Sequence, residues 1–568
     1  MRSPEGGSQA GTDTVRVILQ LKDRPSGRLN ALLNRNGVHV RESFNNLNAL
    51  SLELPAGIIE ELASFPEVDY VSLDRKTQSL GHLSITTGAD AVRQQQLTAS
   101  GSSYQLDGTG IGIAIVDSGM DLSHPAFTGI RRARVLWSQD FTGEGTTADL
   151  YGHGTHVASI AAAAPSLNPL APGIATNANL VNLRVLNRQG TGSVSSILSA
   201  LNWVMTYGRF FNIRVVNLSV GTTAVDSYRN DPVCKAVRRL VDSGVVVVVA
   251  AGNTGKDAEG RKVYGSINSP GIEPSALTVG ASNSYGTNWR GDDTVTSYSS
   301  RGPTRGFYVD ADGVRHYDNL IKPEIVAPGN RVVGAEARNN LIITNNPQLD
   351  ASPYGFGDTR MMYLSGTSMA APVASGAAAM LLQANPRLTP SLIKMILMYT
   401  AQPLAGFNTL EQGSGELNIE GAVRLAKAIR GDVLGNSPVG GPLLVQGIVP
   451  DQQTTIAGYT FAWGGRVVLG PDTATGIDFI TKYQKVYATG IMLGDGIIVS
   501  DGIIVADRSF LSDGIIVSDG IIVSDGIIVS DGIIVSDGII MSDSVLFGDP
   551  KMQAESVMVN GDATAFMQ

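Results

Sequence analysis

The sequence predicts an α/β protein built around a doubly wound, mainly parallel β-sheet, with a small α+β domain before it and a β-rich hexapeptide repeat after it. Between about residues 105 and 430, continuous apolar runs such as IGIAIVDSG and GVVVVVAAGN alternate with helical segments. Strands that are apolar throughout are typical of parallel sheets, which helices cover on both faces. Residues 15–75 instead alternate short strands and helices, and the unit DGIIVS recurs near the C-terminus.

The N-terminal region has the element order βαββαβ, which is complete for a small α+β domain. It follows a flexible tail at 1–14 and ends with a polar stretch, so we assign it to 15–79. Periodicity predicts strands at 15–21 and 69–75, helices at 28–37 and 56–66, and two further strands before Pro55.

The main domain is assigned to 80–430, where helical segments such as SVSSILSALNWVMTYG and PVCKAVRRLVDSG separate the apolar strands. Functional groups are expected at one edge of the sheet, because the carboxyl ends of parallel strands meet there. The region 431–488 is rich in Gly, Pro and short strands, and is assigned as a small β-type extension. The repeat at 489–548 and a C-terminal tail at 549–568 complete the chain.

The repeat carries aspartates in strict six-residue phase. Asp-Gly suits a two-residue hairpin turn, so we favour a narrow meander of short antiparallel strands. A stacked β-helix is less favoured, because it would place the aspartate carboxylates about 4.8 Å apart, where they repel one another. The β-helix and disorder remain as alternatives. The aspartates are Asp495, Asp501, Asp507, Asp513, Asp519, Asp525, Asp531, Asp537 and Asp543.

Charge and composition exclude several classes of protein. The net charge of -9 opposes binding to nucleic acid or anionic lipid. The longest apolar run, 245–251, is far shorter than the roughly 20 residues of a transmembrane helix. The N-terminal sequence MRSPEGGSQAGTDT contains no apolar signal-peptide segment. Cys234 is the only cysteine, which excludes an internal disulfide, and we interpret it as a packing residue.

Three separate segments contain the candidate catalytic residues. Asp117 lies in IAIVDSGMDLSHP where an apolar strand ends, a costly place for a carboxylate that has no partner. His153 lies between glycines in YGHGTHVAS, so its ring can approach another group. Ser368 lies in LSGTSMAAPVASG at the start of a helix, and we place Pro372 in the first turn of that helix. Each residue alone has an ordinary explanation as a turn aspartate, a core histidine or a helix cap.

Together, the three segments resemble the subtilisin family of serine proteases, whose catalytic residues follow the order Asp, His, Ser. The resemblance covers about 105–430 and includes KPEIVAPG at 322–329. An α/β-hydrolase would need G-x-S-x-G with its serine first, whereas Ala370 replaces the last glycine here and the serine comes last. The resemblance implies a serine endopeptidase that forms an acyl-enzyme on Ser368, with His153 as base and Asp117 orienting it.

The resemblance also implies residues that bind the substrate. Asn253 corresponds to the side-chain donor for the oxyanion. An extended protein or peptide substrate is expected to add as a strand between two backbone edges. The edges are Gly190, Thr191 and Gly192 on one side and Ser219, Val220 and Gly221 on the other. The S1 pocket is expected to be lined by Ala250, Ala251, Gly252 and Asn268.

Cofactors, maturation and location follow from the same resemblance. Catalysis needs no metal. Residues 164–173 lack the family's Asn-rich calcium loop, so that calcium site is not carried over, and structural calcium elsewhere is left open. The domain at 15–79 resembles an inhibitor-like prosegment that is cut off between Lys76 and Leu80, which would make the chain a self-processing zymogen. The alternative is a ferredoxin-like accessory domain. An extracellular enzyme is expected, and the repeat is a candidate for self-association.

A second hypothesis, from another class, is a catalytically silent fold used for binding or surface display. The complete set of candidate catalytic residues favours an active enzyme.

Overall fold

The computed structural model divides the chain into two compact units, Met1–Ser79 and Leu80–Gln568. The residues that the structure describes are 14–22, 25–44, 48–73, 82–95, 97–99, 102–128, 134–164, 171–311, 313–352, 359–432, 440–483, 499–500, 504–506, 517–518, 522–524, 552–554 and 562.

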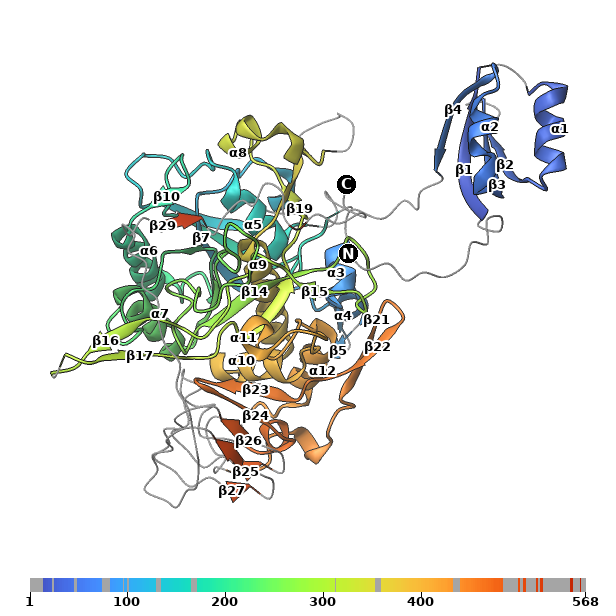
Figure 1. The fold of residues 1–568 in the computed structure, drawn as a ribbon. Helices are drawn as coiled ribbons and strands as arrows, with labels where there is room; N and C mark the ends of the chain where they lie inside the picture. The colour runs from blue at the N-terminus through green and yellow to red at the C-terminus, as the bar shows by residue number, and fades with distance from the viewer. Residues whose placement is uncertain are drawn as a thin grey trace. The chain divides into compact units, whose positions relative to one another are not determined.

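The N-terminal unit is a four-stranded antiparallel sheet with two helices (Figure 1). Its strand order is β2-β3-β1-β4, and its elements follow one another as βαββαβ, the order that the sequence predicts. Leu19, Leu52 and Leu54 of the sheet share one buried cluster with leucines of both helices, so both helices cover the same face. The elements are β1 (Thr14–Leu21), α1 (Gly27–Arg35), β2 (His39–Phe44), β3 (Ala49–Pro55), η2 (Ala56–Ile58), α2 (Ile59–Ala63) and β4 (Val68–Leu73).

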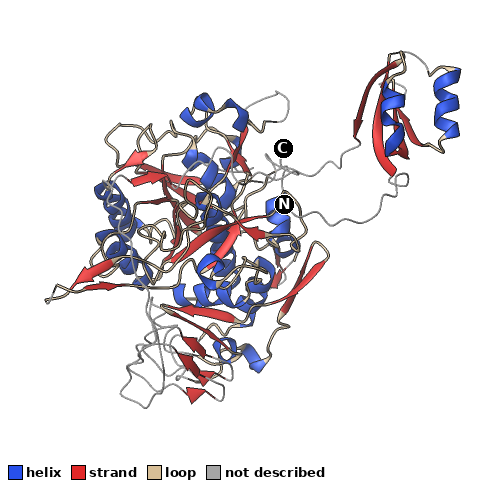
Figure 2. Ribbon diagram, in the orientation of Figure 1, coloured by secondary structure: helices blue, strands red, loops and turns tan. Residues whose placement is uncertain are grey.

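The second unit is built on an eight-stranded, mainly parallel sheet, as predicted (Figure 2). The order is β15-β14-β13-β11-β7-β9-β8, with β18 also pairing with β14, and β15 alone is antiparallel to its neighbour. The strands are β7 (Gly112–Asp117), β8 (Val135–Asp140), β9 (Asn179–Arg184), β11 (Ile213–Leu218), β13 (Val246–Ala250), β14 (Leu277–Asn283), β15 (Thr294–Val295) and β18 (Ile325–Pro328).

Helices cover both faces of this sheet. Side chains alternate along each strand, so Ile113 and Ile115 of β7 join the core on one face and Ala114 and Val116 the core on the other. Burial of each Val, Leu or Ile side chain stabilises the folded state by about 1.5–3 kcal/mol relative to an exposed side chain. One face carries α6 (Val194–Tyr207) and α7 (Pro232–Asp242). The other carries α5 (His153–Ala162), α9 (Thr367–Ala384), α10 (Pro390–Tyr399) and α12 (Ile419–Ala428).

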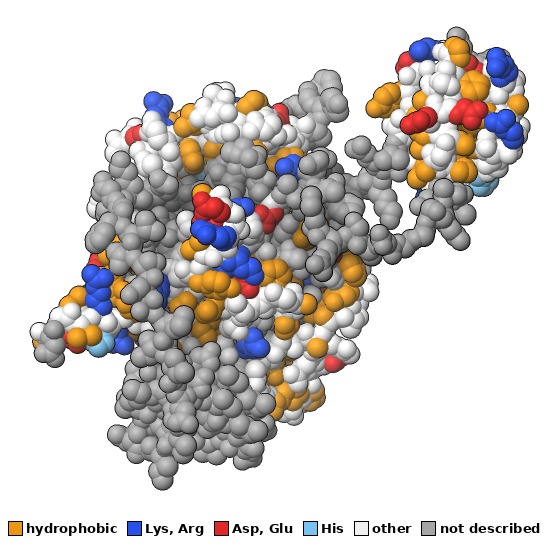
Figure 3. Space-filling view, in the orientation of Figure 1, with side chains coloured by type: hydrophobic (Ala, Val, Ile, Leu, Met, Phe, Trp, Pro, Cys, Tyr) orange, Lys and Arg blue, Asp and Glu red, His pale blue; other side chains and the backbone are white. Residues whose placement is uncertain are grey.

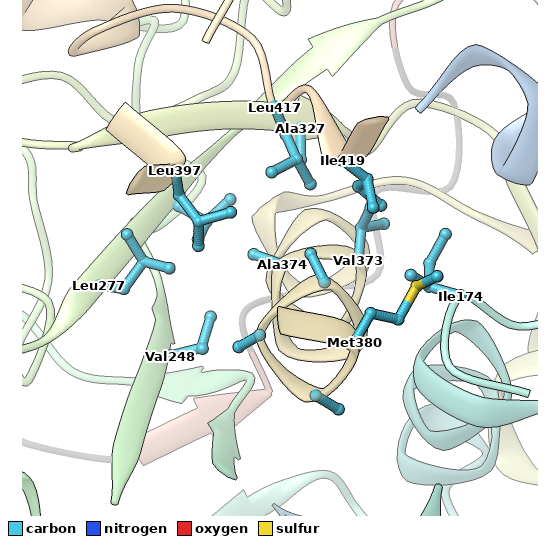
Figure 4. Close-up of a cluster of buried hydrophobic side chains, with 14 of the residues drawn as sticks. Ile174, Val248, Leu277, Ala327, Val373, Ala374, Met380, Leu397, Leu417 and Ile419 are labelled. Carbon is cyan, nitrogen blue, oxygen red and sulfur yellow. The ribbon is translucent and has the colours of Figure 1, made fainter. Parts of the chain in front are cut away.

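Helix α9 forms the centre of the larger core. It is buried on all sides from Thr367 to Leu382, because small residues let neighbouring backbone approach it. A Cβ at Gly376, for example, would lie 2.6 Å from the Cβ of Ile174. Figure 4 shows Val373 and Ala374 of this helix surrounded by side chains from β13, β14, α10 and α12. The helix that carries Ser368 is therefore held from every direction.

The remaining elements of the second unit are short. They are α3 (His82–Thr86), α4 (Ala89–Gln94), β5 (Leu97–Ala99), β6 (Ser102–Tyr104), η3 (Pro125–Phe127), β10 (Thr191–Gly192), β12 (Val220–Gly221), β16 (Phe307–Val309), β17 (Arg315–Tyr317), β19 (Val332–Ala335), α8 (Leu341–Asn345), η4 (Pro347–Leu349), β20 (Met361–Leu364), α11 (Thr409–Gln412), η5 (Val445–Gly447), β21 (Gln453–Ile456), β22 (Tyr459–Ala462), β23 (Arg466–Leu469), β24 (Asp472–Thr475), α14 (Asp478–Thr481) and β29 (Met552–Ala554).

The repeat pairs its described strands in parallel. β25 (Val499–Ser500) pairs with β27 (Val517–Ser518), and β26 (Ile504–Ala506) with β28 (Ile522–Ser524). Both pairings join residues 18 apart, such as Val499 and Val517, which is three hexapeptides. The meander prediction is wrong for these pairs, because neighbouring strands of a meander are antiparallel. All nine in-phase aspartates, the tail at 1–13 and the junction at 76–79 lie outside the described residues.

Figure 3 shows side chains of both charges interspersed with apolar ones on the visible face of the N-terminal unit. Within the described part of the chain, no helix is both long enough and apolar enough to cross a bilayer. Cys234 is buried in α7, and burial raises the pKa of its thiol well above the usual value, which confirms it as a packing residue.

Candidate active site

Asp117 and His153 form a buried pair at the carboxyl edge of the sheet. Asp117 is the last residue of β7, and His153 is the first residue of α5. His153 Nδ1 lies 2.8 Å from Asp117 Oδ1, and the side chains are 0% and 1% exposed. The same oxygen accepts a hydrogen bond of 2.7 Å from the N–H of Ser118. The strand end therefore fixes the carboxylate, and the carboxylate fixes the imidazole.

The two glycines beside His153 are required by close packing. Gly152 has φ +108°, and a Cβ there would lie 2.6 Å from Asn340 Oδ1. A Cβ at Gly154 would collide with the carbonyl oxygen of Gly119. The helix can thus start directly beside the end of β7.

Asp149 supports the pair and was not singled out from the sequence. Its carboxylate accepts hydrogen bonds from Ser118 Oγ at 2.8 Å, Gly152 N at 2.7 Å and Thr155 N at 2.8 Å. The Ser118 hydroxyl in turn accepts one from Gly154 N at 2.9 Å. Burial raises the pKa of Asp149, and the three donors oppose that rise. One buried carboxylate thus ties the end of β7 to the start of α5.

The second histidine of the GHGTHVA motif has a structural role. His156 Nε2 donates to the carbonyl oxygens of Val332 and Met362, at 3.0 and 3.1 Å. Burial lowers the pKa of His156 to about 3, so its ring is neutral at ordinary pH. His153 is therefore the histidine to consider as a base.

Ser368 is the second residue of α9 and is completely buried in this conformation. Its hydroxyl donates to the carbonyl oxygen of Ser219 at 3.3 Å. Pro372 is the sixth residue of the helix, so its predicted place in the first turn is wrong. Because proline has no N–H, it cannot bond the carbonyl of Ser368 four residues earlier. That carbonyl instead accepts a hydrogen bond from Ser219 Oγ at 3.0 Å.

The Ser219 hydroxyl belongs to a buried chain of polar groups that locks α9 against β11. Ser219 Oγ accepts from Asn217 Nδ2 at 2.9 Å, and Asn217 Oδ1 accepts from Ser375 Oγ at 2.9 Å. Helices α5 and α9 also pack directly against each other. The segments of His153 and Ser368 therefore belong to one rigid core.

Asn253 lies beside the start of α9. Its Oδ1 accepts hydrogen bonds from Thr367 N at 2.9 Å and Thr367 Oγ1 at 3.2 Å. Gly252 N donates to the same Thr367 hydroxyl at 3.1 Å. The predicted oxyanion donor is thus fixed against the residue that precedes Ser368.

The predicted S1 residues lie together at the end of β13. Ala250, Ala251 and Gly252 are buried, and Asn268 donates its backbone N–H to Ala251 O at 3.1 Å. A Cβ at Gly252 would lie 3.1 Å from Asn268 Cγ, so the asparagine packs on the glycine.

The two predicted substrate edges are also strands. Thr191–Gly192 form β10 after the turn at Gly190, and Val220–Gly221 form β12 directly after Ser219. Both strands pair with β29, so the structure brings the two edges to opposite sides of a single strand.

Buried lysines occupy a cluster of backbone carbonyls of the kind that cations bind. Lys322 Nζ donates to Glu273 O at 2.8 Å and Ala276 O at 3.2 Å, and Lys394 Nζ also donates to Ala276 O at 2.9 Å. Both form ion pairs of 2.6 Å with Glu324. Burial lowers the pKa of Lys322 to about 8. Among the described residues there is no group of three or more His, Cys, Asp or Glu side chains that could hold a metal ion.

Comparison of the sequence with known proteins places the chain in a family. Residues 108–422 match the model of the Subtilase family. The chain is 31% identical to "Serine protease AprX" of Bacillus subtilis over 392 residues, which cover 68% of this chain and 81% of that one. It is also 31% identical to "Extracellular serine proteinase" of a Thermus species over 363 residues, 63% of this chain and 72% of that one. "Subtilisin E" of Bacillus subtilis is 28% identical over 402 residues, with coverage of 70% and 87%. The protein accordingly belongs to the subtilase family and is a serine-type endopeptidase.

Proposed function

We propose that this endopeptidase cuts protein and peptide chains through an acyl-enzyme on Ser368. Ser368 Oγ attacks the scissile carbonyl carbon while His153 Nε2 takes its proton. The C–N bond then breaks, and the imidazolium returns the proton to the leaving amine. Water, activated by the same imidazole, hydrolyses the ester and restores the serine. None of these steps requires a metal ion.

The observation that carries the proposal is the 2.8 Å contact between Asp117 and His153. The carboxylate accepts from Nδ1–H, which leaves Nε2 as the basic nitrogen of the ring. Both groups are buried, so the attraction between the carboxylate and the imidazolium that forms during reaction is only weakly screened. The pair thus favours proton transfer from the nucleophile.

Asn253 and the N–H of Ser368 are proposed to stabilise the oxyanion. Thr367 holds the oxygen of the Asn253 carboxamide, so the NH₂ group lies at the opposite end of that amide. The N–H of Ser368 belongs to the first turn of α9, the positive end of the helix dipole. In a subtilisin, removal of the oxyanion asparagine lowers kcat by about 100 to 1000 fold, and that measured figure sets the expected scale for Asn253.

Substrate is proposed to bind as an extended strand between β10 and β12, with its P1 side chain beside Ala250, Ala251, Gly252 and Asn268. Small residues on both edges let the substrate backbone approach closely. The pocket residues favour sizeable apolar P1 side chains, with broad specificity overall.

The N-terminal unit is proposed to be a prosegment that the enzyme removes itself, which makes the chain a zymogen. Its independence as the compact unit Met1–Ser79 supports removal at the junction that follows. Structural calcium is not required by this proposal. We place the mature enzyme outside the cell, as the name "Extracellular serine proteinase" states for the Thermus relative.

Active-site labelling tests the assignment. A fluorophosphonate probe should label the wild-type protein on Ser368, and Ser368→Ala should abolish labelling. Ser123→Ala, which alters an exposed serine, is the matched control and should label normally. Label that persists in Ser368→Ala would contradict the assignment. N-terminal sequencing of the same samples should show that only the labelled proteins lose the N-terminal unit.

A further inference from the structure

A strand from the chain's own C-terminal tail lies in the predicted substrate groove. β29 (Met552–Ala554) is the central strand of a three-stranded sheet whose outer strands are β10 and β12. Figure 1 shows β29 in red beside β10. It is antiparallel to both. Gln553 pairs with Thr191 on one side and with Gly221 on the other. The tail therefore uses the same backbone edges that the sequence assigns to substrate.

The direction of this strand leads to the nucleophile. Gln553 pairs with Gly221 and Ala554 with Val220, so each step along the tail moves one residue back along β12. The residue before Val220 is Ser219, whose carbonyl oxygen accepts the hydrogen bond from Ser368 Oγ. The paired strand therefore runs toward Ser219, the residue that Ser368 contacts.

A second anchor holds the tail beyond that point. Asp562 N donates to Asn330 Oδ1 at 2.9 Å, and Asn330 Nδ2 donates to Asp562 O at 3.1 Å. Its carboxylate accepts from Ser297 N at 2.6 Å and from the Ser297 hydroxyl, and it pairs with Lys256 at 3.8 Å. Both the backbone and the side chain of Asp562 are hydrogen-bonded, so we interpret this contact as a specific anchor.

This anchor lies close to the start of α9. Asn330 follows Gly329, whose carbonyl oxygen accepts a hydrogen bond of 2.9 Å from the N–H of Gly366, two residues before Ser368. The eight residue steps from Ala554 to Asp562 can span at most about 29 Å. The tail is thus held at Met552–Ala554 and again at Asp562, and Ser368 is completely buried.

We infer that the C-terminal tail is a substrate of the enzyme's own active site, cut in cis between Ala554 and Asp562. The inference rests on the proposed function of Ser368. Ser368 Oγ adds to a tail carbonyl, the C–N bond breaks, and the departing segment leaves as an amine with the proton from His153. Water then releases the new C-terminal carboxylate. The tail competes with other substrates for the groove, because linkage gives it a millimolar effective concentration.

The register places the bond to be cut beyond Ala554, the last paired residue of the tail. Recognition runs through the backbone, so the identity of the side chain at 553 matters less than its N–H group. Gln553→Pro removes that donor from the middle of the strand, and Gln553→Ala keeps it.

The test follows the C-terminus of the full-length protein by intact mass, beside hydrolysis of a chromogenic peptide anilide with Phe at P1. Wild type and Gln553→Ala should lose the segment after the cut, at a rate that does not change on tenfold dilution. Gln553→Pro should lose it at least about tenfold more slowly while hydrolysing the anilide at full kcat. Ser368→Ala should keep it. Active wild-type enzyme that keeps its tail, a Gln553→Pro rate equal to wild type, or a rate proportional to concentration would overturn the inference.

A second measurement separates this inference from the proposed function. In the Ser368→Ala background the tail cannot be cut, and amide hydrogen exchange of β10 and β12 reports whether the groove is filled. Adding Gln553→Pro should raise exchange in both strands, whereas Gln553→Ala should not. Equal exchange in all three proteins would show that the tail does not dock. Absence of anilide hydrolysis and of serine labelling in wild type, with this exchange difference intact, would instead count against the proposed function.

Discussion

Replacing Asp149 by alanine should weaken the fold and the catalytic pair together. The change leaves Ser118 Oγ, Gly152 N and Thr155 N without the carboxylate that accepts their hydrogen bonds in a buried site. Hydrogen bonds to charged groups contribute roughly 1.5–3 kcal/mol each, so three at the lower end give a loss of about 4.5 kcal/mol in unfolding free energy. Asn in place of Asp149 keeps one acceptor oxygen, and its loss should be about 2 kcal/mol.

Urea denaturation measures the loss, in the Ser368→Ala background so that autolysis does not interfere. Asp432→Ala, which breaks an exposed ion pair with Arg430, is the control and should leave the midpoint unchanged. In active protein, Asp149→Asn should lower kcat at least tenfold at constant KM. The reason is that Ser118 and Gly154 would no longer hold the side chains of Asp117 and His153 in position relative to each other. Unchanged stability and kcat in the Asp149 variants would refute the positioning role.

Three further outcomes follow from buried groups. Burial and the Glu416 carboxylate raise the pKa of Asp293 to about 10, far above its usual 3.8, so the folded state holds a proton that the unfolded state releases. Stability should therefore fall as pH rises between these values, and Asp293→Asn should flatten denaturation midpoints measured from pH 5 to 9; parallel profiles would contradict this. Gly154→Ala should abolish activity through a backbone collision, whereas Gly431→Ala, with its nearest neighbour at 3.7 Å, should be silent in the same peptide assay. Lys322→Met should lower the free energy of unfolding in urea by about 1–3 kcal/mol, since it leaves the buried carbonyl oxygen of Glu273 without its lysine donor and Glu324 with one cation in place of two, and an unchanged midpoint would show that Lys394 suffices.

Local sequence patterns were enough to predict the sheet and the segments that lie at its carboxyl edge. The apolar runs that end at Asp117 and Ala250 are strands because only a doubly covered parallel sheet buries such runs, and their ends place polar residues at one edge. The glycines around His153 indicated close approach, and the structure shows which backbone they approach. These features are encoded within a few residues of where they act.

Features that depend on distant partners were not predictable in this way. Asp149 resembles any loop aspartate until folding brings three donors to it. The tripeptide at 552–554 has no strand pattern, and it forms a strand because two distant edges offer it partners. In the repeat, Asp-Gly favours a hairpin locally, yet the described pairing joins residues 18 apart in parallel. In these pairs, the long-range strand register therefore outweighs the local preference of Asp-Gly for a hairpin turn.

The complete burial of α9 places Ser368, the proposed nucleophile, in the most cooperative part of the molecule. Segments that open in sub-global fluctuations are those with few apolar contacts, and α9 has apolar neighbours on every side. Ser368 can therefore not be displaced by fraying of a peripheral loop. We expect its displacement only with global unfolding of the second unit, so a partly loosened molecule would keep the proposed nucleophile in place and would still cut neighbouring copies of itself.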